Sequence, residues 1–272
     1  MMKSRYPAFP YILFMAIFIV VPLLIVVYFA FTTSGGSFTL QNIIRVKNYI
    51  PVTIKSLYLS LVATIICLVL GYPFAYIMAR KTSNIRRTMF MLIMLPMWMN
   101  FLLRTYAWMT ILEDNGLINK LLMAIGLGPV HMINTQGAVV LGMVYDYLPF
   151  MIVPLYTVLM KMDYSLVQAA QDLGGNPFQV FTKVILPLSL PGISTGITMV
   201  FVPSVSTFII SRMLGGGGNL LIGDLIDLQF LGNAYNPHLG SAISLVLMVL
   251  ILLCMSILNQ FNSDEDRDGM LL

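Results

Sequence analysis

Six long apolar runs limit what this chain can fold into. They cover approximately residues 9–32, 55–79, 88–112, 136–160, 188–211 and 239–261. A helix needs roughly 20 apolar residues to cross a hydrocarbon core about 30 Å thick. Since such a core holds no water to bond the backbone, each run is expected to be helical. The sequence therefore predicts an all-α, polytopic membrane protein with six transmembrane helices.

Composition excludes a soluble domain and argues against a nucleic-acid partner. Apolar residues make up 58% of the 272 residues and charged residues only 10%, whereas a soluble chain is about 25% charged. The 15 Lys and Arg residues are spread along the chain and form no basic face of the kind that binds nucleic acid. The expected surroundings of the chain are therefore a lipid bilayer.

The distribution of Lys and Arg predicts which side of the membrane each link faces. Cytoplasmic links carry an excess of these residues. The link between the second and third runs has no acid but carries Arg80, Lys81, Arg86 and Arg87. We therefore expect a multi-pass protein of the plasma (inner) membrane with both termini in the cytoplasm. Residues 1–262 would form one transmembrane domain, and residues 263–272 a cytoplasmic tail without structure of its own.

The loop at about residues 162–188 has strong local folding signals. Asp163 is expected to cap a short helix, which Gly174 ends because glycine accepts the left-handed conformation at a helix C-terminus. Asn176 is expected to cap a second short helix that ends just before Pro187, where the chain turns back into the bilayer. The two helices would meet at a glycine corner on the cytoplasmic side. These features fit either a partner protein with a groove or a helix pair that rests on lipid headgroups.

The same loop resembles the EAA loop of type I ABC importer permeases. The pattern consists of Gln168-Ala169-Ala170, then Gly174, then Val184-Ile185-Leu186-Pro187. In that family the loop docks as a coupling helix in a cleft of the cytoplasmic ATPase. The resemblance therefore implies a docking role for Gln168, Ala169, Ala170, Gly174, Val184, Leu186 and Pro187. The family usually has Glu at the position of Gln168, so no salt bridge is implied there.

Other segments resemble the first permease subunit of the spermidine/putrescine importers within this family. They are Leu70–Ala75, Leu95–Trp98, Leu103–Trp108, Leu148–Met151 and Gly215–Gly223. The resemblance implies a type I ABC permease fold and the translocation of polyamines that an external binding protein delivers. It also implies two copies of a cytoplasmic ATPase and a second, related permease subunit.

The chain itself is not expected to be an enzyme. It has no phosphate-binding loop of the G-x-x-x-x-G-K-[ST] type. ATP and magnesium are therefore expected to be used by the partner ATPase, and no cofactor is expected on this chain. No metal site is expected either, because His131 and His238 are far apart and lack metal-ligand spacing.

Asp146 is the main candidate for contact with a cationic substrate inside the membrane. A carboxylate at membrane depth is costly unless it faces a cavity or a partner, and the ring of Tyr145 suits an ammonium group. An ion pair with Arg104 would satisfy Asp146 equally well. Arg104 itself, with Trp98 and Trp108, fits an outer belt of interfacial residues.

The external loop at about residues 212–238 contains a glycine run, which suits a hinge or a tight turn. If its middle forms an amphipathic helix, Asp224 and Asp227 share one face and Arg212 can pair with one of them. Such a pair would act as an external gate that a polycation opens by competing for the acid. The alternative is an exposed loop with solvated charges. The substrate-path candidates are Asp146, Tyr145, Trp98, Trp108, Phe208, Arg212, Asp224 and Asp227.

Two other functions compete with polyamine import. The same architecture could carry another small solute, because few acidic residues are available to select a cation. A secondary transporter driven by an ion gradient would need intramembrane ion ligands and usually shows internal repeats. Neither of these is evident in the sequence.

Overall fold

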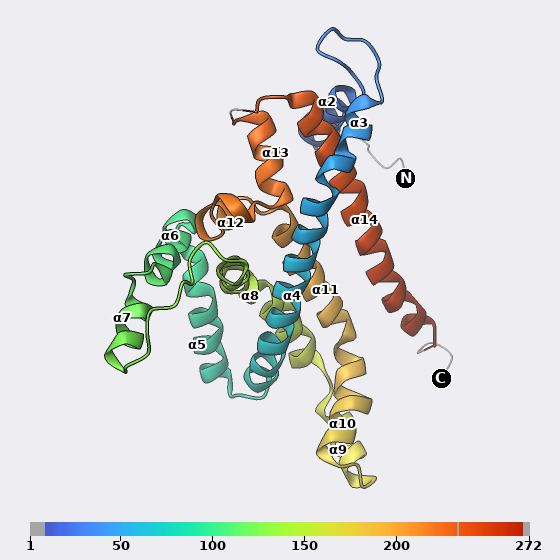
Figure 1. The fold of residues 1–272 in the computed structure, drawn as a ribbon. Coiled ribbons are helices and arrows are strands. Elements are labelled where there is room, and N and C mark those ends of the chain that lie inside the picture. The colour runs from blue at the N-terminus through green and yellow to red at the C-terminus, as the bar shows by residue number, and fades with distance from the viewer. Residues whose placement is uncertain (1–8, 233, 269–272) are drawn as a thin grey trace, which may run out of the picture.

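The computed structural model describes residues 9–232 and 234–268, with side chains described up to residue 257. No strand occurs in this part of the chain, which confirms the all-α prediction (Figure 1). The elements are α1 (Phe9–Met15), η2 (Ala16–Val20), α2 (Val21–Ala30), α3 (Gln41–Arg45), η3 (Val46–Tyr49), α4 (Ile50–Ala79), α5 (Ser83–Met94), η4 (Leu95–Trp98), α6 (Phe101–Leu112), α7 (Leu117–Ala124), α8 (Gln136–Lys161), α9 (Tyr164–Asp172), α10 (Pro177–Val180), η5 (Phe181–Ile185), α11 (Leu186–Ser206), α12 (Ile209–Leu214), η6 (Gly217–Asn219), α13 (Ile222–Phe230) and α14 (Pro237–Asp268).

Five helical segments of the described residues are long and apolar enough to cross a membrane. They are Pro10–Ala30, Gln41–Ala79, Gln136–Lys161, Pro177–Ser206 and Pro237–Ile257. A sixth span exists if the bent pair Ser83–Trp98 and Phe101–Ala124 is counted as one. The predicted number of six therefore holds only with this broken segment.

The third predicted span, 88–112, is broken in the structure, because the chain bends by 90° between α5 and α6. Pro96 lies in the first turn of the 3₁₀ helix η4, and Met99 after it is extended. The side chain of Asn100 then accepts hydrogen bonds from the backbone N–H groups of Leu102 (2.9 Å) and Leu103 (3.4 Å). Since this is an N-cap, Asn100 begins a new helix in a new direction.

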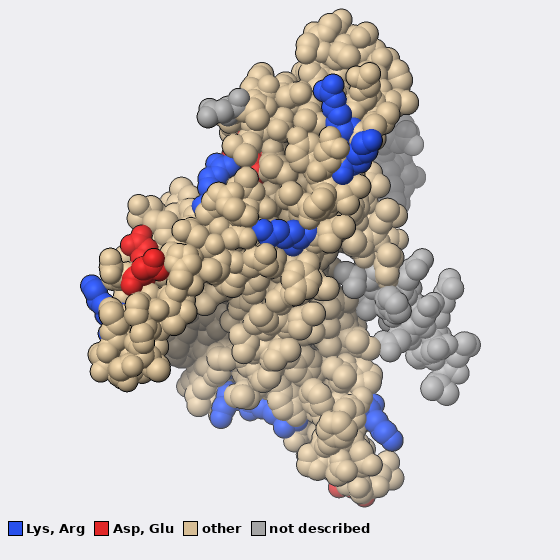
Figure 2. All heavy atoms as spheres, viewed as in Figure 1, with Lys and Arg blue, Asp and Glu red and all other residues tan. Residues whose placement is uncertain are grey.

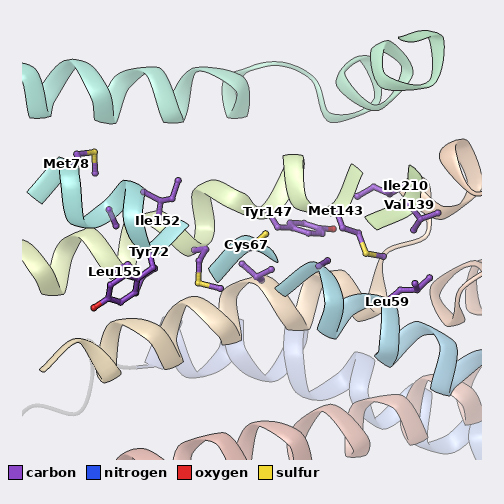
Figure 3. Packing of buried hydrophobic residues seen from close by; sticks show 14 of the residues in the cluster. Leu59, Cys67, Tyr72, Met78, Val139, Met143, Tyr147, Ile152, Leu155 and Ile210 are labelled. Carbon is purple, nitrogen blue, oxygen red and sulfur yellow. The ribbon is translucent and has the colours of Figure 1, made fainter. Parts of the chain in front are cut away.

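The core consists of α4, α8 and α11 packed closely together. In Figure 3, Leu59, Cys67 and Met78 of α4 lie in one layer with Met143 and Leu155 of α8. Small residues allow this approach, as they do between other membrane helices. A Cβ on Gly71 of α4 would lie 3.1 Å from Met151 Cγ, and one on Gly192 of α11 would lie 3.1 Å from the Pro154 oxygen. A smaller cluster joins α2, α11, α13 and α14.

The fifth span is longer than predicted. Elements α10, η5 and α11 form one helical path over Pro177–Ser206, so the predicted separate short helix before Pro187 is wrong. The π-helix η5 precedes Pro187, and the N–H of Leu186 donates to the Phe181 oxygen. This wider turn lets the helix continue past Pro187, which has no backbone N–H to donate to the preceding turn. The break comes later, at Thr207, which is extended.

The two ends of the molecule differ in shape. The α9–α10 corner projects at the lower end in Figure 1, at the same end as the turn between α4 and α5, while α12 and α13 lie at the upper end. Figure 2 shows basic side chains at the lower end, around the turn between α4 and α5, and further basic side chains at the upper end. Helix α14 runs to Asp268, so the predicted tail at 263–272 is helical as far as it is described, and residues 269–272 lie outside the described part.

Gly223→Ala is expected to lower the melting temperature of the purified protein in detergent. A Cβ at this second residue of α13 would lie 2.4 Å from the Thr207 oxygen and 2.5 Å from the Ser206 oxygen, both backbone atoms. Overpacking of this kind costs about 1–3 kcal/mol. The control is Gly137→Ala at the second residue of α8, where the nearest atom, Thr135 Oγ1, is 3.7 Å away. Equal melting temperatures of the two variants would contradict the close contact.

Candidate functional site

The corner formed by residues 163–180, called the knuckle below, folds locally as its sequence predicts. The Ser165 N–H donates to Asp163 Oδ1 at 3.0 Å, and this bond holds the pKa of Asp163 below its ordinary value. Helix α9 ends at Gly174, whose φ of 83° lies in the left-handed region. Asn176 and Gln179 exchange hydrogen bonds of 2.8 and 3.0 Å in a capping box that begins α10.

The tip of the knuckle is apolar and uncovered. Leu173 is 89% exposed and Phe178 is 75% exposed, whereas Val167 and Val180 hold the two helices together from inside. A shallow groove of about 270 Å³ lies beside the tip and is lined partly by Ala170, Gly174, Gly175 and Val184. An exposed apolar tip of this kind is typical of an interaction surface.

The predicted docking residues lie on or close to this knuckle. Gln168, Ala169 and Gly174 are exposed, and Ala170 is partly buried beside them. Val184, Leu186 and Pro187 lie further along the same helical path, in η5 and the start of α11. Leu173 was missed by the sequence analysis, because its exposure depends on the left-handed turn at Gly174 and not on its residue type.

Asp146 is paired with Arg104 in the structure. Arg104 Nε lies 2.5 Å from Asp146 Oδ1, and both side chains are almost fully buried. Arg104 Nη1 also donates to the Pro96 oxygen at 2.8 Å, so the guanidinium links the 95–98 turn to α8. The alternative that Arg104 belongs to an outer interfacial belt is therefore wrong, since its residue exposure is only 8%.

Two of the predicted aromatic residues meet beside this ion pair. The rings of Trp108 and Tyr145 form an edge-to-face contact with centroids 5.3 Å apart. Both line an apolar groove of about 670 Å³ between α4, α6 and α8, together with Tyr58 and Gln136. Trp98 is 81% exposed on the 95–98 turn and does not line this groove.

The remaining path candidates form a second cluster, the outer cluster, on α12 and α13. Arg212 Nη2 donates to Asp227 Oδ2 at 2.6 Å, and its Nε lies 3.7 Å from Asp224 Oδ1. The Phe208 ring lies 5.8 Å from the Arg212 guanidinium carbon. The amphipathic helix considered for this loop therefore exists as α13, and the cation pairs with both acids.

Asp224 is fully buried and contacts three other residues of the outer cluster. Its Oδ2 accepts hydrogen bonds from Ser211 Oγ (2.5 Å) and from the Leu221 N–H (2.9 Å). Burial raises the pKa of Asp224 above its ordinary value, and these hydrogen bonds oppose the rise. Ser211 was not predicted from the sequence, because its hydrogen bond to Asp224 depends on how α12 lies against α13.

Hydrogen bonds tie the glycine-rich loop to α4. Lys55 Nζ donates to Asn219 Oδ1 at 2.8 Å, and the Ile222 N–H donates to Ser56 Oγ at 2.8 Å. The outer cluster is therefore connected to a central helix and is not an isolated surface feature. Across the described residues, no group of three or more His, Cys, Asp or Glu side chains could hold a metal ion.

Comparisons with known proteins agree with this architecture. Residues 71–264 match the family described as "Binding-protein-dependent transport system inner membrane component". The spermidine/putrescine transport system permease protein PotB of Haemophilus influenzae is 39% identical over 260 residues, which cover 92% of this chain and 91% of the relative. PotB of Escherichia coli is 37% identical, covering 87% and 90%. A bacterial ABC transporter involved in the import of alginate has the same fold, with a TM-score of 0.79, 17% identity and 96% coverage of both chains.

Arg104→Met is expected to destabilise the protein by about 3–5 kcal/mol, because it leaves the Asp146 carboxylate buried without its partner. The double variant Arg104→Met/Asp146→Leu is expected to regain most of that stability, since no buried charge remains. Thermal unfolding of the purified variants in one detergent measures both effects. If the loss of stability in the double variant equals the sum of the losses in Arg104→Met and in Asp146→Leu, the two side chains do not interact.

Proposed function

The chain belongs to the family of binding-protein-dependent transport system inner membrane components, and we propose that it is a permease subunit of an ABC importer for polyamines. Membership makes it a multi-pass inner membrane transport protein and not an enzyme. The polyamine substrate is supported by the PotB relatives, which are similar over most of their length and are described as spermidine/putrescine permeases.

The exposed knuckle is the observation that best supports ATP-driven transport. Its apolar tip, with Leu173 and Phe178, extends beyond the spans and is suited to the cleft of a cytoplasmic ATPase. Two ATPase copies would use ATP and magnesium, one copy on this chain and one on a second permease. The basic cluster of Arg80, Lys81, Arg86 and Arg87 in the turn at the same end supports a cytoplasmic position for the knuckle. An even number of six spans would place both termini on that side.

A second, related permease would complete the pore. The outward face of α4 carries large exposed apolar side chains, among them Tyr58 (59%) and Val69 (64%). The groove that contains Trp108 and Tyr145 opens between α4, α6 and α8. Lipid covers part of these surfaces, and the partner permease would cover the rest, so that residues 1–262 act as one half of the channel.

The outer cluster is proposed as the external gate. Asp227 is only 17% exposed in its side chain, and Arg212 is 45% exposed. A polyamine released by an external binding protein would compete with the Arg212 guanidinium for Asp227. Once the cluster opens, the aromatic rings of Trp108 and Tyr145 would offer their faces to the ammonium groups.

Leu173→Glu is expected to reduce the amount of ATPase that co-purifies with the tagged complex and to abolish uptake. A charge at the apolar tip would have to be desolvated in the ATPase cleft. The control is Leu231→Glu, a leucine that is 85% exposed after α13 at the opposite end of the molecule, and it should retain the ATPase. Undiminished co-purification with Leu173→Glu would contradict docking at this tip.

Asp227→Asn is expected to raise the spermidine concentration that gives half-maximal uptake in cells carrying the complete transporter. The loss of one partially buried carboxylate removes an attraction for the polycation. The control is Asp114→Asn, which removes an exposed acid that pairs with His131. An unchanged concentration dependence would remove Asp227 from the path.

Two further outcomes separate the competing functions. Failure of the unaltered transporter to take up labelled spermidine would favour another solute. Uptake that persists without the ATPase subunit would favour an ion-gradient mechanism.

A further inference from the structure

A pocket of about 350 Å³ lies where α4 and α8 end, next to the start of the knuckle. Its lining combines apolar side chains with hydrogen-bond donors: Ala79, Leu159, Met160 and Met162, with Tyr76, Arg80 and Tyr164. Neither the substrate path nor ATPase docking uses it. The ends of the spans Gln41–Ala79 and Gln136–Lys161 place the pocket at the level where hydrocarbon gives way to headgroups.

Arg80 is held in the pocket by aromatic rings and not by a carboxylate. Its guanidinium carbon lies 4.0 Å from the centre of the Tyr76 ring and 5.5 Å from that of the Tyr164 ring. A guanidinium stacked on a ring keeps its N–H groups free at the edge of its plane, where they match the oxygens of a phosphate. Among the described side chains of residues 10–232 and 234–257, no acid pairs with Arg80, and the hydroxyls of Tyr76 and Tyr164 make no hydrogen bond.

The charge around the pocket also favours an anion. Residues 80–87 contain Arg80, Lys81, Arg86 and Arg87 and no acid, and Figure 2 shows basic side chains around the turn between α4 and α5. Basic pockets between transmembrane helices near the membrane surface suit the headgroups of anionic lipids. The apolar residues of the lining suit the glycerol and the first carbons of an acyl chain, which a free phosphate lacks.

We propose that this pocket binds the phosphate headgroup of an anionic phospholipid. The Arg80 guanidinium donates to two phosphate oxygens, and the hydroxyls of Tyr76 and Tyr164 donate to the remaining acceptors. Leu159 and Met160 contact the apolar part of the lipid. Because Tyr164 is the first residue of α9, the bound lipid lies against the base of the knuckle. The proposal stands apart from the choice of transported solute.

The test is lipid binding by the purified complex, followed by native mass spectrometry with phosphatidylglycerol and with phosphatidylcholine. The unaltered protein is expected to retain phosphatidylglycerol in preference. Arg80→Gln should weaken this binding at least about tenfold, because charge-assisted hydrogen bonds are lost. Arg80→Lys should bind phosphatidylglycerol more weakly than the unaltered protein and more tightly than Arg80→Gln, since it keeps the charge and loses the planar guanidinium.

Lys161→Gln is the matched control. It removes one positive charge at the same end of α8, from an exposed residue that does not line the pocket, and should bind phosphatidylglycerol as the unaltered protein does. Equal binding by Arg80→Gln and the unaltered protein would overturn the site. Equal losses in Arg80→Gln and Lys161→Gln would also overturn it in favour of a diffuse charge effect. Displacement of phosphatidylglycerol by inorganic phosphate at comparable concentration would show a free-phosphate site instead.

Discussion

The helical path from Pro177 to Ser206 is the element on which the rest of the structure depends. It has 30 residues and is therefore about 45 Å long, so it reaches from the knuckle into the middle of the core. Close contacts fix it there: Gly192 lies against α8, and Ser189 Oγ lies 2.8 Å from the hydroxyl of Tyr72 on α4. The path is helical throughout, so it connects the knuckle to the packed helices without an intervening loop. This continuity gives the proposed docking site a physical route to the pore.

Two charge clusters, each with a buried carboxylate, fix the parts of the chain that the core does not hold. The Arg104–Asp146 pair attaches the bent segment α5–α6 to α8. Each ion offsets the desolvation cost of burying the other. The outer cluster fastens α13 to α12 through Asp224 and Arg212. The first cluster lies beside the groove of Trp108 and Tyr145, and the second is tied to the glycine-rich loop. Under the proposed function, these clusters would hold one state of the transporter and release it. A cationic solute is the kind of ligand that would compete for their acids.

The sequence predicted much of this, because the signals were local. Runs of apolar residues gave the spans, and the knuckle followed from Asp163, Gly174 and Asn176, whose backbone partners lie within a few residues. The bend between α5 and α6 was missed since apolar composition does not reveal direction, which the N-cap at Asn100 sets. The continuity through Pro187 was missed because proline usually marks a break, whereas here a π-turn precedes it. The burial of Arg104 and the exposure of Leu173 depend on tertiary packing, which no local pattern contains.

The most direct measurement of the central claim is the position and neighbour of the knuckle tip in intact cells. A photo-reactive amino acid in place of Phe178 should form a cross-link to the ATPase subunit. Phe178→Cys should react with a membrane-impermeant thiol reagent only after the cells are opened, with the variant lacking this cysteine as the background. An ATPase adduct together with protection from the external reagent is the predicted result. Labelling of Phe178→Cys in sealed cells, with no adduct to an ATPase, would contradict the account.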